Sequence, residues 1–310
     1  MPRKKSHSGS VGVQATEGAA ADLARARSWG YQLQKLDLAA TASAPHDLIV
    51  IDYARDGSHD TALTPQDLAN LKLKPDGTRR LVYAYISVGE AESYRFYWRK
   101  EWRKSPPDWI VAENSDWKGN FLVAFWHDDW RSILLDPQDG YITRIAAQGF
   151  DGLYLDRCDV FEDLEDADHS AIEDAGDLEQ RMVDFIAGLS AHVRATHPGL
   201  GLIMQNAEQL LSHKAVLMAL DGMAKEELLF GMSGGSRRNA RSETAEARQD
   251  LDRARRSGRP VFCVEYLDDD EKRATAISEI AQFGFVPYVA RADRELDTLE
   301  PPADPDSVTS

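Results

Sequence analysis

Short apolar segments alternate with longer amphipathic segments along most of the chain, and this alternation constrains the fold more than any other feature. Short runs rich in β-branched and aromatic residues, bounded by glycine or polar residues, predict buried strands. We expect eight such strands, over Trp29–Leu33, Leu48–Asp52, Arg80–Ser87, Leu153–Leu155, Gly201–Asn206, Leu220–Glu226, Pro260–Glu265 and Phe285–Ala290. Between them, apolar spacing and capping residues predict helices over Tyr141–Gln148, Leu178–Thr196, Ser242–Arg256 and Asp270–Phe283, and a shorter one beginning near Thr64-Pro65.

Alternation of strands and helices predicts an α/β fold, and about eight strands favour a (β/α)8 barrel of the TIM type. Fewer strands in an open order would instead give a doubly wound sheet. Segment Phe121–Trp126 is expected to form an extra strand in a loop excursion over the C-terminal rim, and Asp163–Asp177 an acidic loop. We predict one domain over residues 27–295, with flexible tails at residues 1–26 and 296–310, both of which are mostly small and polar.

Polar side chains follow the predicted strands at the point where each strand ends. The clearest case is GFDGLYLDRCDVFE, residues 149–162, in which the apolar run Leu153–Leu155 stops at Asp156. In a parallel barrel, the carboxyl ends of the strands form the rim at which ligands bind. A lone aspartate there would also suit a simple turn, but the pattern repeats, and the predicted rim carries Asp52, Glu90, Asp156, Asn206, Glu226 and Glu265.

A rim rich in carboxylates allows three interpretations. Glycoside hydrolysis needs two carboxyl groups, one to protonate the leaving oxygen and one to act as base or nucleophile. A divalent metal site would also use oxygen ligands. A structural role would pair some carboxylates with Arg95, Arg157 or Lys225. The residue types favour the hydrolase over the metal site, and we expect no bound metal or cofactor.

Composition excludes several classes of protein. The net charge of −16 argues against nucleic acid as the main partner. No apolar run approaches the ~20 residues of a membrane-spanning helix. The basic N-terminus is followed by no apolar core, so it is not a complete secretory signal, and a cytoplasmic location is expected. The two cysteines, Cys158 and Cys263, make no disulfide framework, and their spacing does not match that of metal ligands. We also expect the protein to be a monomer.

Several segments together resemble the glycoside hydrolase 114 family, the endo-α-1,4-polygalactosaminidases and their relatives. The resemblance covers about Trp29 to Ala290, and its segments are LIVIDYARDG, AYISVGEAESYRFYW, WKGNFLVAFW, GFDGLYLDRCD and AKEELLFG. It implies a (β/α)8 barrel and a partly deacetylated, and therefore cationic, galactosamine polymer as substrate. It also implies a catalytic pair in which Asp156 matches the aspartate and Glu226 matches the glutamate, with Glu227 as the alternative. Relatives in this family are often exported, which differs from the location expected above.

The remaining rim residues are predicted to bind substrate. Tyr53, Tyr85, Asn206 and Tyr266 lie at or near strand ends, where a ring face and a polar group suit a sugar, although Tyr85 could instead point into the helix layer. Asp52, Glu90 and Glu265 are expected to orient the ammonium groups of the sugar. An alternative function is a non-catalytic barrel that binds cationic polysaccharide. Aminoacylation, suggested by an older name for relatives of the family, is not expected, because the sequence lacks the ATP-binding motifs of a class I synthetase.

Overall fold

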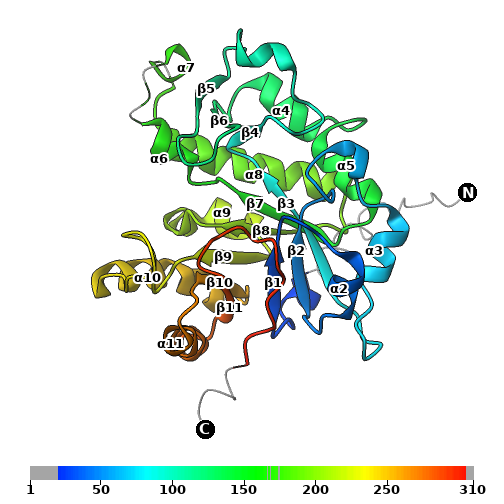
Figure 1. The fold of residues 1–310 in the computed structure, drawn as a ribbon. Coiled ribbons are helices and arrows are strands. Elements are labelled where there is room, and N and C mark those ends of the chain that lie inside the picture. The colour runs from blue at the N-terminus through cyan, green and yellow to red at the C-terminus, as the bar shows by residue number, and fades with distance from the viewer. Residues whose placement is uncertain (1–19, 166, 168, 174, 305–310) are drawn as a thin grey trace, which may run out of the picture.

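Eight parallel strands form one sheet that is nearly closed into a barrel, as the sequence predicted (Figure 1). The computed structural model describes residues 20–304 except residues 166, 168 and 174. The strands pair in chain order as β1 (Trp29–Gln32), β2 (Leu48–Ile51), β3 (Leu81–Ser87), β7 (Gly152–Asp156), β8 (Gly201–Gln205), β9 (Gly222–Glu226), β10 (Val261–Tyr266) and β11 (Val286–Ala290). The sheet begins with β1 and ends with β11, and these two strands meet where the indole Nε1 of Trp29 donates to the carbonyl oxygen of Val286 at 3.1 Å.

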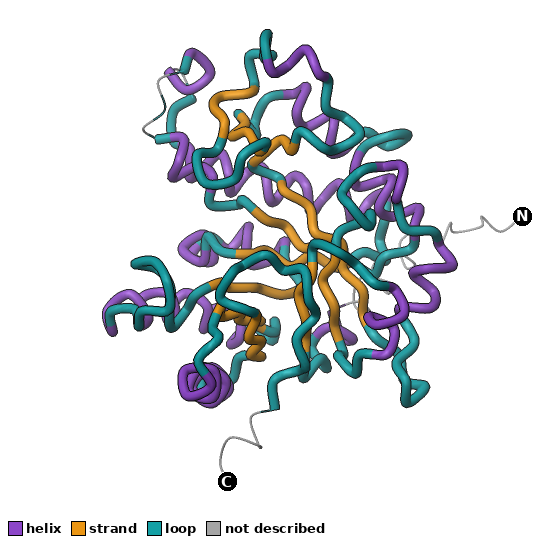
Figure 2. The backbone as a smooth tube through the Cα atoms, viewed as in Figure 1, coloured by secondary structure: helices purple, strands orange, loops and turns teal. Residues whose placement is uncertain are grey.

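Most of the helices lie on the outside of the barrel (Figure 2), whereas α7 lies apart from it. The helices are α2 (Leu38–Ser43), α3 (Pro65–Leu71), α4 (Asp128–Leu135), α5 (Tyr141–Gln148), α6 (Val160–Leu164), α7 (Ser170–Glu173), α8 (Leu178–Thr196), α9 (Lys214–Ala219), α10 (Arg241–Arg256) and α11 (Asp270–Gln282). The predicted bounds of α5 and α8 agree with the structure. The segment expected to be an acidic loop contains the short helix α7. Within the described part of the chain, no helix is both long and apolar enough to cross a membrane.

Strand alternation divides the buried apolar residues into two layers. Alternate residues of each strand point into the barrel, where tyrosine and tryptophan side chains fill much of the interior. The interior cluster includes Trp29, Tyr31, Val50, Tyr83, Tyr85, Tyr154, Ile203, Ala224, Phe262, Val264 and Tyr288. The other residues pack against the helices. Two glycines make room for one large ring, because a Cβ on Gly152 or Gly201 would lie 2.2 or 2.1 Å from Tyr83.

A small antiparallel sheet is inserted between β3 and β7 and lies over the rim of the barrel. The sequence predicted a loop excursion in this segment. Its strands are β4 (Glu90–Glu92), β5 (Ile110–Glu113) and β6 (Asn120–Val123), in the order β4-β6-β5. The indole of Trp130 on α4 donates to the carbonyl oxygen of Val88 at 2.9 Å, which joins the end of the excursion to its beginning.

The packed part of the chain extends beyond the predicted domain boundaries at both ends. Leu23 is fully buried among the residues of the barrel interior. At the other end, the carbonyl oxygen of Leu296 accepts from the backbone of Leu33 at 2.8 Å, and the backbone of Glu300 donates to the hydroxyl of Tyr288 at 2.9 Å. The segment 296–300 is therefore held against the barrel, whereas residues 1–19 and 305–310 lie outside the described residues.

One buried arginine joins the ends of two helices to the barrel. The side chain of Arg80 is fully buried and donates to five backbone carbonyl oxygens, those of Thr41, Ala42, Ala44, His46 and Leu71. These carbonyls lie at or just beyond the C-terminal ends of α2 and α3, where backbone acceptors lack intrahelical partners and carry partial negative charge. Arg80 thus satisfies acceptors that would otherwise be buried without a donor.

We expect Arg80→Met to lower the free energy of unfolding by about 3 kcal/mol or more, because it leaves several buried carbonyls unpaired. The measurement is urea unfolding followed by circular dichroism. Arg79→Met is the matched control: Arg79 is half exposed, and its partner Asp151 keeps Lys72 at 2.8 Å, so a loss within about 1 kcal/mol is expected. Equal losses for the two variants would contradict this role of Arg80.

Candidate active site

Three adjacent strands end in polar side chains that point to the same place on the rim. Asp156, Gln205 and Glu226 are the last residues of β7, β8 and β9. Each comes two residues after a member of the interior cluster, so strand alternation directs all three toward the barrel axis. Because parallel strands end at the same edge, the three side chains converge.

A single amide connects the two carboxylates. The Nε2 atom of Gln205 donates to Oδ1 of Asp156 at 2.8 Å and to Oε2 of Glu226 at 2.9 Å. Since both oxygens bind one nitrogen, they are separated by less than about 6 Å, which is shorter than the ~6.5–9.5 Å between the carboxyl groups of inverting glycosidases. The structure therefore brings together the two residues that the sequence singled out as the catalytic pair.

Two tyrosines and an asparagine complete the contacts of the pair. The hydroxyl of Tyr85 donates to Oδ2 of Asp156 at 2.7 Å, and that of Tyr266 donates to Oε1 of Glu226. The amide of Asn206 donates to Oε2 of Glu226 at 3.2 Å. Tyr85 thus points into the barrel rather than the helix layer, and three of the residues predicted to bind substrate lie against the carboxylates.

Burial and mutual repulsion favour the protonated forms of the pair. Burial, followed by the negative charge of Glu226, raises the pKa of Asp156 to about 6, while the hydrogen bond from Tyr85 opposes this rise. Burial also raises the pKa of Glu226, against the hydrogen bonds from Tyr266 and Asn206. Two neighbouring carboxylates that each resist ionisation favour a state in which they hold one proton between them.

The backbone turns sharply after each of the three strands. Arg157, Asn206 and Glu227 have φ angles of 60°, 56° and 54°, which L-residues other than glycine rarely adopt. Two of these residues directly follow Asp156 and Glu226, and the third directly follows Gln205. After β7 and β9, the left-handed turn separates consecutive side chains, so that Asp156 and Glu226 face the barrel axis while Arg157 and Glu227 take other partners. After β8, Asn206 instead binds the same oxygen of Glu226 as Gln205.

Glu227, the alternative catalytic glutamate, has such different partners. It forms an ion pair with Arg294, and its backbone N–H donates to the carbonyl oxygen of Val264 at 2.9 Å. The guanidinium of Arg294 also lies over the ring of Tyr266, 5.6 Å from its centroid. Glu226 rather than Glu227 therefore shares Gln205 with Asp156.

Glu90 is almost completely buried beside the pair and is bound by three side chains. Arg157 Nε lies 2.8 Å from its Oε1, and the amides of Asn114 and Asn120 donate to its two oxygens at 2.7 and 3.1 Å. Arg157 also contacts Asp159 and Asp163. The negative charge of Glu90 is thus compensated within the protein. Through its ion pair with Arg157, Glu90 connects the excursion to the turn after β7.

Asp52 has a similar arrangement at the end of β2. Its Oδ2 lies 2.7 Å from the buried guanidinium of Arg95, which also binds Glu92 at 2.7 Å. The neighbouring Tyr53 is fully buried, with its hydroxyl unpaired and its ring packed edge-on against Tyr141 at 5.1 Å. Neither Asp52 nor Tyr53 contacts the carboxylate pair.

Glu265 points out of the barrel, away from the pair. It comes one residue before the inward-facing Tyr266, and it is completely buried. Its two oxygens accept from the backbone N–H groups of Leu229 and Phe230 at 2.7 and 3.1 Å, and burial raises its pKa to about 8. Glu265 therefore holds the loop that follows Glu226, and the structure does not bring it to the candidate site.

Sequence reasoning missed three residues of the site. The sequence predicts Asn206 at the rim and does not single out Gln205. Strand alternation from Ile203 nevertheless directs the side chain of residue 205 toward the barrel axis. Tyr31 and Tyr154 lie below the pair, and the pKa of each is raised well above its usual value by burial and by the charges of Asp156 and Glu226. Strand alternation predicts from the sequence that both side chains face the barrel interior. The sequence does not show the sheet register that places them next to the pair.

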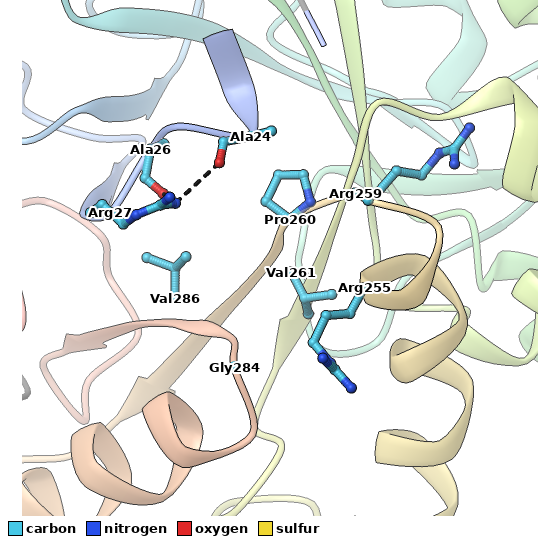
Figure 3. A pocket seen from close by; sticks show the side chains of 10 residues that line it. Ala24, Ala26, Arg27, Arg255, Arg259, Pro260, Val261, Gly284 and Val286 are labelled. Atoms are coloured by element: carbon cyan, nitrogen blue, oxygen red, sulfur yellow. Dashed lines mark hydrogen bonds between the residues drawn. The ribbon is translucent and has the colours of Figure 1, made fainter. Parts of the chain in front are cut away.

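The described residues offer no metal site, and apart from the candidate site they include a pocket at the other end of the barrel. The described residues contain no group of three or more His, Cys, Asp and Glu side chains arranged to hold a metal ion. A pocket of about 190 Å³ lies near the starts of β10 and β11, at the opposite end of the barrel. Its three arginines, Arg27, Arg255 and Arg259, point in different directions and donate to protein atoms (Figure 3).

Comparisons with known proteins identify a family and several relatives of this chain. Residues 12–306 match the glycoside-hydrolase family GH114. An uncharacterized protein of Methanocaldococcus jannaschii is 38% identical over 282 residues, covering 87% of this chain and 77% of the relative. One from Thermotoga maritima is 32% identical over 281 residues, covering 88% and 83%.

A solved structure shares the fold. The glycoside hydrolase domain of PelA from Pseudomonas aeruginosa superposes with a TM-score of 0.64 at 21% identity, over 88% of this chain and 97% of that domain. At that identity, the likeness concerns the fold alone. The family match over nearly the whole described chain, together with the relatives, shows that this protein belongs to the glycoside-hydrolase family GH114.

Proposed function

We propose that this protein is an endo-acting glycosidase that cleaves α-1,4 linkages in a partly deacetylated galactosamine polysaccharide, with Asp156 and Glu226 as its catalytic carboxylates. The observation that carries the proposal is the pair itself, two partly buried carboxylates bound to one amide. The proposed linkage and sugar rest on the family. An excess of acidic side chains near Asp156 supports a cationic substrate, because three carboxylates, those of Glu90, Asp159 and Asp163, share the single guanidinium of Arg157.

The short distance between the carboxylates favours a retaining mechanism. In the first step, an oxygen of Asp156 attacks the anomeric carbon, the bond to the leaving sugar breaks, and Glu226 transfers its proton to the leaving oxygen. In the second step, Glu226 removes a proton from water, the water oxygen attacks the same carbon, and the bond to Asp156 breaks. The two displacements restore the original anomeric configuration.

Neighbouring charges support this assignment of roles. The guanidinium of Arg157 favours the ionised form of Asp156, as a nucleophile requires. The negative charge of Glu227 favours the protonated form of Glu226, as a general acid requires. The repulsion that Glu226 exerts on Asp156 also disappears when Glu226 holds the proton. Tyr85, Asn206 and Tyr266 hold the pair, and we propose that their exposed edges contact the sugar.

We expect the purified protein to release new reducing ends from partly deacetylated galactosamine polymer. Asp156→Asn and Glu226→Gln should each lower kcat about 10²-fold or more, because each removes a group that acts in bond breaking. Glu227→Gln is the matched control and should retain activity within a few-fold. Binding without reducing ends from pH 4 to 8 would instead indicate a non-catalytic polysaccharide-binding barrel, and an inactive Glu227→Gln beside an active Glu226→Gln would move the catalytic role to Glu227.

We expect the first product to have the same anomeric configuration as the bond that is cleaved. Proton NMR during the first minutes of hydrolysis measures this, before mutarotation mixes the anomers. An inverted first product would show that Asp156 acts on water as a base, which needs a larger carboxyl separation of ~6.5–9.5 Å.

We expect the pKa of Asp156 to be lower in Glu226→Gln than the value of about 6 in the unmodified protein, because the substitution removes a neighbouring negative charge. Carbon-13 NMR of labelled aspartate side chains, assigned with Asp156→Asn, measures this without substrate. The same titration in Glu265→Gln should leave Asp156 unchanged, since Glu265 points away from the pair. An unchanged pKa in Glu226→Gln would show that the carboxylates titrate independently.

A further inference from the structure

Gln205 occupies the position between the two carboxylates. It ends β8, which pairs with β7 on one side and β9 on the other, and its side chain is only 2% exposed. Its Nε2 carries two protons, and the nitrogen donates to one carboxylate on each side. The amide can therefore satisfy both carboxylates only in this one orientation.

This orientation limits where the pair can carry a proton. Oδ1 of Asp156 and Oε2 of Glu226 each face an N–H donor, so a proton on either oxygen would be directed against the amide. The other two oxygens face the hydroxyls of Tyr85 and Tyr266. A hydroxyl can donate to an ionised oxygen and accept from a protonated one, so these contacts suit both states.

We propose that Gln205 is a positioning residue that holds the two carboxylates at a fixed separation and keeps the catalytic proton on the tyrosine-facing oxygens, which places the acidic proton of Glu226 on Oε1. This inference rests on the proposed glycosidase function and adds a role that acts through the pair. Without the amide, the carboxylates would lose their shared donor, and Oδ1 of Asp156 would become available to the proton, whereas Oε2 of Glu226 would keep the weaker contact with Asn206 at 3.2 Å.

Several charged and titratable side chains also influence the protonation of the pair, in addition to the neutral donor Gln205. The titratable and charged side chains that influence the pair come from β1, β3, β7 and β10 and from the turns after β7 and β9; they are Tyr31, Tyr85, Tyr154, Arg157, Asp159, Glu227 and Tyr266. The cation of Arg157 is shared with Glu90, Asp159 and Asp163, and Glu227 is paired with Arg294. Gln205 is a donor that binds both carboxylates at once.

A second glutamine provides a natural comparison. Gln148 is also buried, and its Nε2 donates to two acceptors, the backbone carbonyls of Tyr53 and Leu63, at 2.9 and 2.8 Å. In both glutamines, Oε1 is buried without a partner. The two side chains thus share burial and donor geometry and differ in the acceptors, which are carboxylates for Gln205 and backbone carbonyls for Gln148.

The experiment compares Gln205→Met with Gln148→Met, which keep a similar side-chain length and remove both hydrogen bonds. Loss of a donor disfavours the ionised carboxylates, so Gln205→Met should move both limbs of the pH profile of kcat/KM upward by about half a unit or more. We expect kcat to fall about 10- to 100-fold with a small change in KM. Gln148→Met should lower the unfolding temperature and leave the pH profile in place.

Carbon-13 titration of Asp156 in the same variants separates this inference from the proposed function, because it needs no substrate. A raised pKa of Asp156 in Gln205→Met supports the positioning role even if the polymer proves not to be the substrate. An unchanged pKa and pH profile, or equal shifts in Gln148→Met, would overturn it. If Gln205→Met does not fold, Gln205→Glu replaces it: a third carboxyl should raise the pKa of Asp156 further, and a pKa that stays at its original value would again overturn the inference.

Discussion

Two like-charged groups held beside each other in a partly buried site are unfavourable for folding, and much of the rim is arranged around this pair. A carboxyl group with a raised pKa stabilises the folded state below its unfolded pKa, and that contribution is lost as the pH rises through the folded pKa. For Asp156 this loss runs from about pH 4 to about pH 6. Near neutral pH the folded protein therefore tolerates a strained charge state, which the surrounding hydrogen bonds limit but do not remove.

The surrounding structure limits this cost by giving nearby carboxylates partners of their own. Asp52 is bound by Arg95, Glu90 by Arg157 and two amides, and Glu265 by two backbone N–H groups. The sequence shows all of these as acidic residues at strand ends, and they look alike there. In the structure, Asp52 and Glu90 bind a guanidinium, whereas Asp156 and Glu226 are bound mainly by neutral hydroxyl and amide groups. Glu265 also has neutral donors, but it points away from the pair. That difference leaves the pair able to exchange a proton.

The sequence predicted the barrel, the excursion, the bounds of α5 and α8, and a rim of polar residues, because these follow from local periodicity and strand order. The pairing of Asp156 with Glu226 was implied by the family resemblance. It could not separate Glu265 from Tyr266, since the two are adjacent and only the exact strand parity decides which one faces the axis. It also could not show that Arg95 reaches Asp52, because that contact joins segments 43 residues apart through the folded excursion. Gln205 lay within reach of the same parity argument, but the predicted strand ended one residue later, at Asn206, whereas β8 ends at Gln205.

The last packed segment of the chain reaches the active site through Arg294, which contacts both Glu227 and the ring of Tyr266. Tyr266 in turn binds Glu226. Arg294, which lies beyond the final strand, therefore supports the candidate site through Tyr266. During synthesis, the strands that carry the carboxylates leave the ribosome well before this segment does. The nascent barrel therefore acquires its complete site only after residues beyond β11 have emerged, and a chain that stalls after β11 would carry both carboxylates but lack the contact of Arg294 with Glu227 and Tyr266.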